Sequence, residues 1–237
     1  MIFAESVTQA FEVIRAAYCF DAFTPVPHPD NIRFRADEER KVMHRLGLML
    51  PGLTNDPDSQ WAGQIVLQYF WKEIGLKQPP AALEVVPRFL LPPDHPLEPR
   101  IDLAELVRQM KQVPLPKQET ICIVSSKLTS LQKLLNLSDV QTKFLKLVYI
   151  SHFHPDLHGH ARFSLQAALQ HIEIRDGMHC NAVIAALIDE PVAAVEVMFA
   201  PPMSLMALRF LDSGFNERQR NLQNVLVDSQ LDSLKAI

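Results

Sequence analysis

Five residues with metal-binding side chains lie within one stretch of nine residues: His152, His154, Asp156, His158 and His160. Imidazole nitrogens and carboxylate oxygens are common zinc ligands, and a zinc ion with an open position can activate water for hydrolysis. The same stretch also fits a structural role, in which Pro155 ends a preceding helix and the imidazoles lie at the surface. The structural role is favoured, because the apolar residues before the stretch repeat with helical spacing.

The segment 151–156, Ser-His-Phe-His-Pro-Asp, resembles the metal-binding loop of metallo-β-lactamase-fold hydrolases, which reads His-x-His-x-Asp-His. That resemblance implies zinc ligation by His152, His154 and Asp156. The pattern then departs from the family, because Leu157 follows the aspartate and His158 is displaced by one residue. The family's loop also leaves a strand of a β-sandwich. A zinc hydrolase is therefore kept as an alternative, and no metal or other cofactor is expected.

Cys180 lies next to His179, which raises two further alternatives: a thiol nucleophile, or a zinc site shared with the histidine cluster. Adjacent residues seldom face each other, and a buried cysteine is more common than a reactive one. The sequence contains no phosphate loop, no dinucleotide-binding glycine motif and no Gly-x-Ser-x-Gly nucleophile elbow. We therefore assign no catalytic residue, and we do not expect the chain by itself to be an enzyme.

The elements that carry these residues are predicted to be mainly helical. Apolar residues at helical spacing and local capping signals predict helices at 5–20, 36–50, 58–74, 102–112, 121–135, 138–151, 165–172, 181–188 and 192–199. Ser138 and Gln141 have the spacing of a capping box, and Asp102 is a candidate N-cap. The runs 205–211 and 222–227 are predicted to form a β-hairpin, which would complete a winged helix with the two preceding helices.

Prolines divide the chain. Nine of the 18 lie between Pro79 and Pro116, where they rule out one long helix. The predicted organisation is a helical domain at 1–76, a Pro-rich connector at 77–118 that one short helix interrupts, and a winged-helix-like helical domain at 119–237.

Composition limits the functional classes. The 237 residues are 48% hydrophobic, which is typical of a globular protein. The 23 basic side chains are outnumbered by 27 acidic ones, which disfavours nonspecific electrostatic binding of nucleic acid. The presumed recognition helix 192–199 has no Lys, Arg, Asn or Gln, so a DNA-binding regulator is only an alternative. Three distant cysteines, no expected signal peptide and no long apolar run predict a cytoplasmic protein outside the membrane.

The second half carries a wider pattern of apolar positions. Its segments are 131–138, 144–150, 154–157, 183–187, 192–197, 206–212 and 226–231. In this pattern residues 119–237 resemble the region that precedes the ATPase module in a group of bacterial AAA-family ATPases. The resemblance implies a non-catalytic accessory region that recruits a protein partner or substrate, or assists assembly into a homo-oligomer, with ATP bound by a neighbouring module.

Aromatic residues provide the candidate contact surfaces for a protein partner. Trp61, Phe70 and Trp71 belong to the predicted helix 58–74, and Phe89 belongs to the connector. Exposed aromatic residues often anchor protein interfaces. The helix is apolar nearly all round, however, so burial in the core is the favoured alternative for its aromatic residues.

Overall fold

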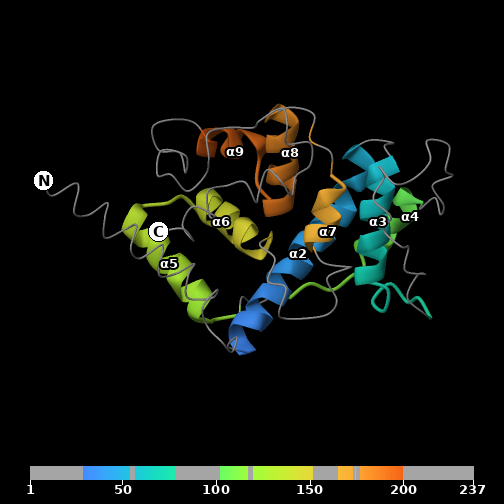
Figure 1. The fold of residues 1–237 in the computed structure, drawn as a ribbon, viewed down its shortest axis with the longest axis horizontal. Helices are drawn as coiled ribbons and strands as arrows, with labels where there is room; N and C mark the ends of the chain where they lie inside the picture. Colours follow the sequence, from blue (N-terminus) through green and yellow to red (C-terminus); the bar gives the residue numbers. More distant parts are fainter. Residues whose placement is uncertain are drawn as a thin grey trace, which may run out of the picture.

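The computed structural model describes residues 29–53, 57–77, 102–116, 120–151, 165–172, 174 and 177–199. Within these residues the chain is mainly helical and contains no strand, as predicted (Figure 1). The helices are α2 (Pro29–Leu53), α3 (Pro57–Tyr69), α4 (Leu103–Met110), α5 (Ile123–Leu135), α6 (Asp139–Ser151), α7 (Leu165–Gln170), α8 (Gly177–Ile188) and α9 (Val192–Phe199). None of these helices has the length and apolar character that crossing a membrane requires.

Helix α2 is the element against which most of the others pack. It contacts α3 and α4 on one side and α5, α6, α7 and α8 along the rest of its length (Figure 1). The reason lies in one stripe of fully or nearly fully buried residues at helical spacing: Phe34, Val42, Met43, Leu46 and Leu50. A helix with so wide an apolar stripe is stable only when several partners cover it.

Helix α4 comes from the Pro-rich segment and belongs to the core. Asp102 is its N-cap, as predicted, and its carboxylate accepts hydrogen bonds from the backbone N–H groups of Ala104 and Glu105 at 3.0 and 3.1 Å. Leu106 and Met110 are buried where α4 packs on α2. The predicted connector is therefore interrupted by a helix that contributes two core residues.

The start of α6 confirms the predicted capping box. The backbone N–H of Ser138 donates to Oε1 of Gln141 at 2.8 Å, and the N–H of Gln141 donates back to the Ser138 hydroxyl at 3.2 Å. The helix then buries Phe144, Leu147 and Val148. The chain thus enters the histidine-rich segment from a helix, whereas the loop of a metallo-β-lactamase-fold hydrolase leaves a strand.

Helices α8 and α9 are joined by a short turn. Asp189 adopts the left-handed conformation that commonly ends a helix, with φ of 58°. The N–H of Glu190 then donates to the carbonyl of Ala185 at 2.9 Å, and the carbonyl of Pro191 accepts from Ala194 at 3.0 Å as α9 begins. Val183 and Ile184 of α8 lie in the core.

The core is continuous across the predicted domain boundaries. It contains residues from α2 and α3, from α4 within the Pro-rich segment, and from α5 to α9. The division into 1–76, 77–118 and 119–237 stays a prediction about how the chain folds. The predicted helix 5–20 and the hairpin runs 205–211 and 222–227 lie outside the described residues, so the winged helix also stays a prediction.

Candidate functional site

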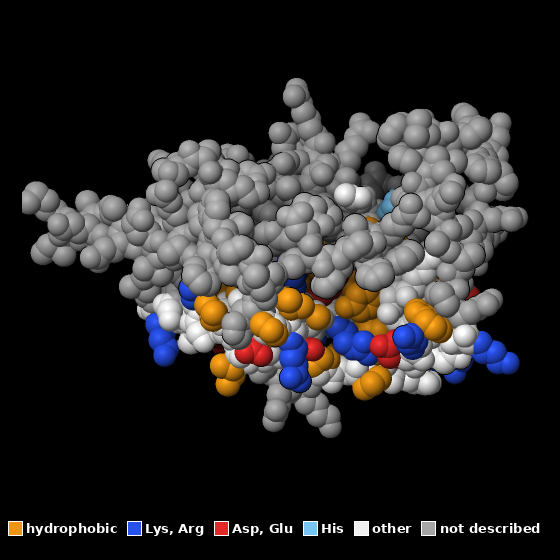
Figure 2. All heavy atoms as spheres, turned by 60° about the horizontal axis from the view of Figure 1, so that its bottom comes forward, with side chains coloured by type: hydrophobic (Ala, Val, Ile, Leu, Met, Phe, Trp, Pro, Cys, Tyr) orange, Lys and Arg blue, Asp and Glu red, His pale blue; other side chains and the backbone are white. Residues whose placement is uncertain are grey.

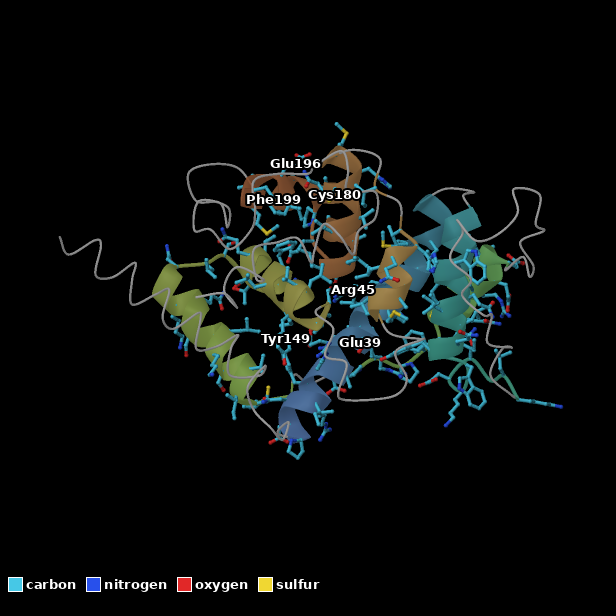
Figure 3. All side chains as sticks on the ribbon, in the orientation of Figure 1. Glu39, Arg45, Tyr149, Cys180, Glu196 and Phe199 are labelled. Atoms are coloured by element: carbon cyan, nitrogen blue, oxygen red, sulfur yellow. The ribbon has the colours of Figure 1, made fainter. Side chains whose placement is uncertain are left out.

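The outer side of α9 exposes aliphatic side chains. Val195 and Met198 face inward and are buried, whereas Val197 is 74% exposed and Val192 and Glu196 are also exposed. Glu196 lies on the outer side of the helix (Figure 3). We call Val192, Ala193, Glu196 and Val197 the α9 outer face. It offers aliphatic groups and one carboxylate to a ligand.

The position of α9 is fixed by its inner side. Phe199 packs edge-on against Phe144 of α6, with ring centroids 5.4 Å apart. Helix α9 also lies in contact with α8. The outer face therefore belongs to a helix that packs on α6 and α8 and not to a loop.

This outer face is poorly suited to DNA. Major-groove readers use Arg, Lys, Asn or Gln on the recognition helix, and none occurs between Val192 and Phe199. Figure 2 shows a different side of the molecule, because it brings the bottom of Figure 1 forward, whereas α9 lies at the top. On that side Lys and Arg side chains alternate with Asp, Glu and apolar side chains, and the described residues form no continuous basic stripe there.

The aromatic residues predicted to contact a partner have different surroundings. Phe70 is fully buried, and the guanidinium of Arg40 lies 5.0 Å from the centre of its ring. The His44 ring lies nearly perpendicular to it, with ring centroids 6.4 Å apart. Phe70 thus lies in the core of the described residues, which was the favoured alternative for this helix. Partner binding by Phe70 stays a prediction.

Trp61 and Trp71 are half-buried. The indole of Trp61 stacks on the imidazole of His171 at 6.0 Å, and the ammonium of Lys72 lies 5.3 Å from the Trp71 ring. Partner binding by the two tryptophans stays a prediction. Phe89 lies outside the described residues.

The candidate ligands of the zinc alternative, His152, His154, Asp156 and His158, also lie outside the described residues. Elsewhere, in the described ranges, no group of three or more His, Cys, Asp or Glu side chains is arranged to hold a metal ion. The zinc alternatives therefore rest on the sequence pattern alone.

Cys180 has the surroundings of a structural cysteine. It is 5% exposed on α8, and burial raises the pKa of its thiol to about 12. A thiolate, which is the nucleophilic form, is therefore strongly disfavoured near neutral pH. The neighbouring His179 is only half-buried, so the two adjacent side chains do not share one environment.

Glu39 is a half-buried titratable group with a structural role. Its carboxylate, labelled in Figure 3, accepts a hydrogen bond from the backbone N–H of Leu165 at 2.8 Å, at the first residue of α7. Burial raises the pKa of Glu39, whereas the hydrogen bond from Leu165 and the charge of Arg35 oppose that rise. This contact links α2 to α7 across a long sequence separation.

The sequence analysis missed a pocket between α2, α6 and the end of α8. Its charged residues are Glu38, Lys41, Arg45, Lys143 and Lys146. The available signal was the spacing of three or four residues between charges on each helix, which places them on one face. Nothing in that spacing indicates that the charged face of α2 meets the charged face of α6.

The described part of the chain thus holds an aliphatic outer face on α9, a charged pocket and several buried polar groups that stabilise packing. A scan against protein-family models and searches of curated proteins and of solved structures found no match to this chain.

Proposed function

We propose that the chain is a non-catalytic accessory region of a bacterial AAA-family ATPase, which recruits a protein partner or substrate or assists assembly. The observation that carries this proposal is the α9 outer face. A helix held rigidly by α6 and α8 presents Val192 and Val197 to the outside with one carboxylate and no cation. Exposed aliphatic groups on a rigid helix favour contact with protein.

Two further features support the proposal. The apolar positions of residues 119–237 resemble the region before the ATPase module, and the helices at 123–135, 139–151, 177–188 and 192–199 have the order that this resemblance implies. Cys122 and Cys180 are free and buried, which suits a reducing cytoplasm. ATP would be bound by the neighbouring module and not by this chain.

The test is binding between this chain and the ATPase module encoded with it or next to it, measured by calorimetry and by the ATPase rate. Val197→Asp places a charge in the α9 outer face and is expected to weaken binding by about tenfold or more, the typical effect of a disrupted interface centre. Met178→Asp is the matched control, because Met178 is also 74% exposed but lies at the start of α8. It should bind as the unmodified chain does.

Three results would contradict the proposal. One is the absence of any binding to, or effect on, the ATPase module. Another is equal binding by the Val197 and Met178 variants, which would exclude the α9 outer face as the contact. The third is a salt-dependent shift with duplex DNA, which would favour the DNA-binding regulator.

A further inference from the structure

The four residues of the α9 outer face lie in two adjacent rows along the helix. Val192 and Glu196 are one turn apart, and so are Ala193 and Val197. The exposed fraction is 38% for Val192 and 74% for Val197. Glu196 lies on the same outer side (Figure 3). The face therefore places one carboxylate directly beside exposed aliphatic groups.

Glu196 makes no ion pair or hydrogen bond with any residue that the structure describes. The other two acidic residues nearby differ in this respect. Asp189 lies 3.7 Å from the guanidinium of Arg45, and Glu190 lies 2.5 Å from the ammonium of Lys143. Helices α8 and α9 and the turn between them contain no Lys or Arg. The carboxylate of Glu196 is thus the charge of this region that these recorded ion pairs leave uncompensated.

The shape of the α9 outer face suits a second helix better than an extended peptide. An extended peptide binds to the unpaired backbone groups of a sheet edge, whereas the outer side of a helix offers side chains. Rows of residues four apart form the ridges and grooves into which another helix packs. The small side chain of Ala193 lies between Val192 and Val197 and allows the second helix to approach closely.

Docking of a second helix would remove water from Glu196. A carboxylate that loses water without gaining a partner destabilises the complex, whereas a cation on the docked helix compensates for the lost water. Glu196 therefore disfavours helices that are apolar or acidic at this point and selects those with a cation. Arg fits best, because its planar group can donate two hydrogen bonds to one carboxylate.

We propose that the α9 outer face binds an amphipathic helix that has aliphatic residues along one side and an Arg or Lys opposite Glu196. This inference rests on the proposed function and names the chemistry of its protein partner. The same carboxylate would repel the phosphates of a nucleic acid and the headgroups of acidic lipids.

The probe is a pair of synthetic peptides of about 20 residues, which is long enough for a helix to form. Both have the same stripe of Leu and Ala, and they differ at one position within that stripe, which is Arg in one peptide and Glu in the other. Each is titrated into the full chain by calorimetry. The Arg peptide should bind at least about tenfold more tightly than the Glu peptide. Glu196→Arg should reverse this preference.

Two further variants and one control separate the charge of Glu196 from other effects. Glu196→Gln should reduce the preference for the Arg peptide. Glu105→Gln changes the net charge equally but lies on α4, away from α9 (Figure 1), and should leave the preference unchanged. Val197→Ser should weaken both peptides alike, because it removes apolar contact and no charge.

Three results would overturn the inference: no binding of either peptide, equal affinity of the two peptides for the unmodified chain, or equal effects of the Glu105 and Glu196 variants. Equal affinity would do so even if Val197→Asp weakens binding of the ATPase module, so the proposed function would survive. A clear preference for the Arg peptide without any binding of the ATPase module would support the inference and contradict the proposed partner.

Discussion

His44 is a buried imidazole in the centre of the helical core. Its Nε2 lies 2.7 Å from the carbonyl oxygen of Met110, so the ring joins α2 to the last residue of α4. Burial lowers the pKa of His44 below its usual value of 6.5, and the charges of Arg45 and Arg40 lower it further. The hydrogen bond to Met110 opposes this shift, because it favours the protonated ring.

These surroundings of His44 predict that the folded protein loses stability in mild acid. The folded state prefers the neutral imidazole, so its stabilising contribution is present above the unfolded pKa and is lost as pH falls through the folded pKa. His44→Gln keeps a donor for Met110 but does not titrate. The free energy of unfolding, measured by denaturant titration from about pH 8 down to about pH 5, should therefore fall more for the unmodified chain than for the variant. Parallel curves would show that His44 does not titrate in this way.

At the residue scale, interactions between residues close together in the sequence were predicted better than interactions between residues far apart in it. The capping box of Ser138 and Gln141 and the N-cap Asp102 depend on residues two or three positions away, and both were predicted correctly. The surroundings of His44 and Phe70 depend on how α2, α3 and α4 meet. No local pattern specifies that meeting, so the sequence favoured burial for Phe70 without indicating that Arg40 and His44 would surround its ring.

Gly47 and Gly52 on α2 form a matched pair at the scale of one helix. A Cβ atom at Gly47 would lie 2.9 Å from both Met110 Cγ and Val66 Cγ1, whereas a Cβ atom at Gly52 would meet nothing within 4 Å. Gly47 therefore allows α3 and α4 to approach α2 closely. Gly52 has no such neighbour.

Replacing each glycine by alanine should have opposite effects. Gly47→Ala is expected to destabilise the fold by about 1–2 kcal/mol, because overpacking against the stiff Val66 outweighs the better helix propensity of alanine. Gly52→Ala should stabilise it by about 0.5–1 kcal/mol through propensity alone. Denaturant unfolding of both variants measures this difference. Stabilisation by Gly47→Ala would show that the helices can move apart at little cost.

At the scale of single elements, it was easier to predict that a segment forms a helix than to predict where that helix begins or ends. The predicted range 192–199 equals α9, because Pro191 and the turn before it give a clear start. Helix α2 begins at Pro29, seven residues before the predicted start, because polar residues surround Phe34 and hide the apolar stripe. Helix α8 begins at Gly177 and not at residue 181, since glycine more often indicates the end of a helix.

The shared core determines how the molecule as a whole should unfold. Leu106 lies in the Pro-rich segment, is 1% exposed and packs in the same core cluster as residues of α2 and α8. Leu106→Ala is expected to destabilise the protein by about 2–5 kcal/mol, as for other buried leucines. Leu76→Ala is the control, because Leu76 is 36% exposed and should cost less than about 1 kcal/mol.

The measurement is thermal unfolding followed by calorimetry and by far-ultraviolet circular dichroism. If the described helices form one cooperative unit, Leu106→Ala will shift a single transition, and both methods will agree. Two transitions, of which only one shifts, would instead support separate domains at 1–76 and 119–237. At this scale the sequence predicted the mainly helical class, but the packing of α2 across the Pro-rich segment depends on contacts far apart in the chain.

The position of α2 has a practical consequence for anyone who prepares part of this protein. A polypeptide that starts at residue 119 would lack α2, α3 and α4, and the apolar sides of α5, α6, α7 and α8 that rest on α2 would face water. Such a fragment should aggregate during expression, whereas one that retains residues 29–116 should stay monodisperse. The contacts of residues 29–116 are thus a solubility requirement for the rest of the chain.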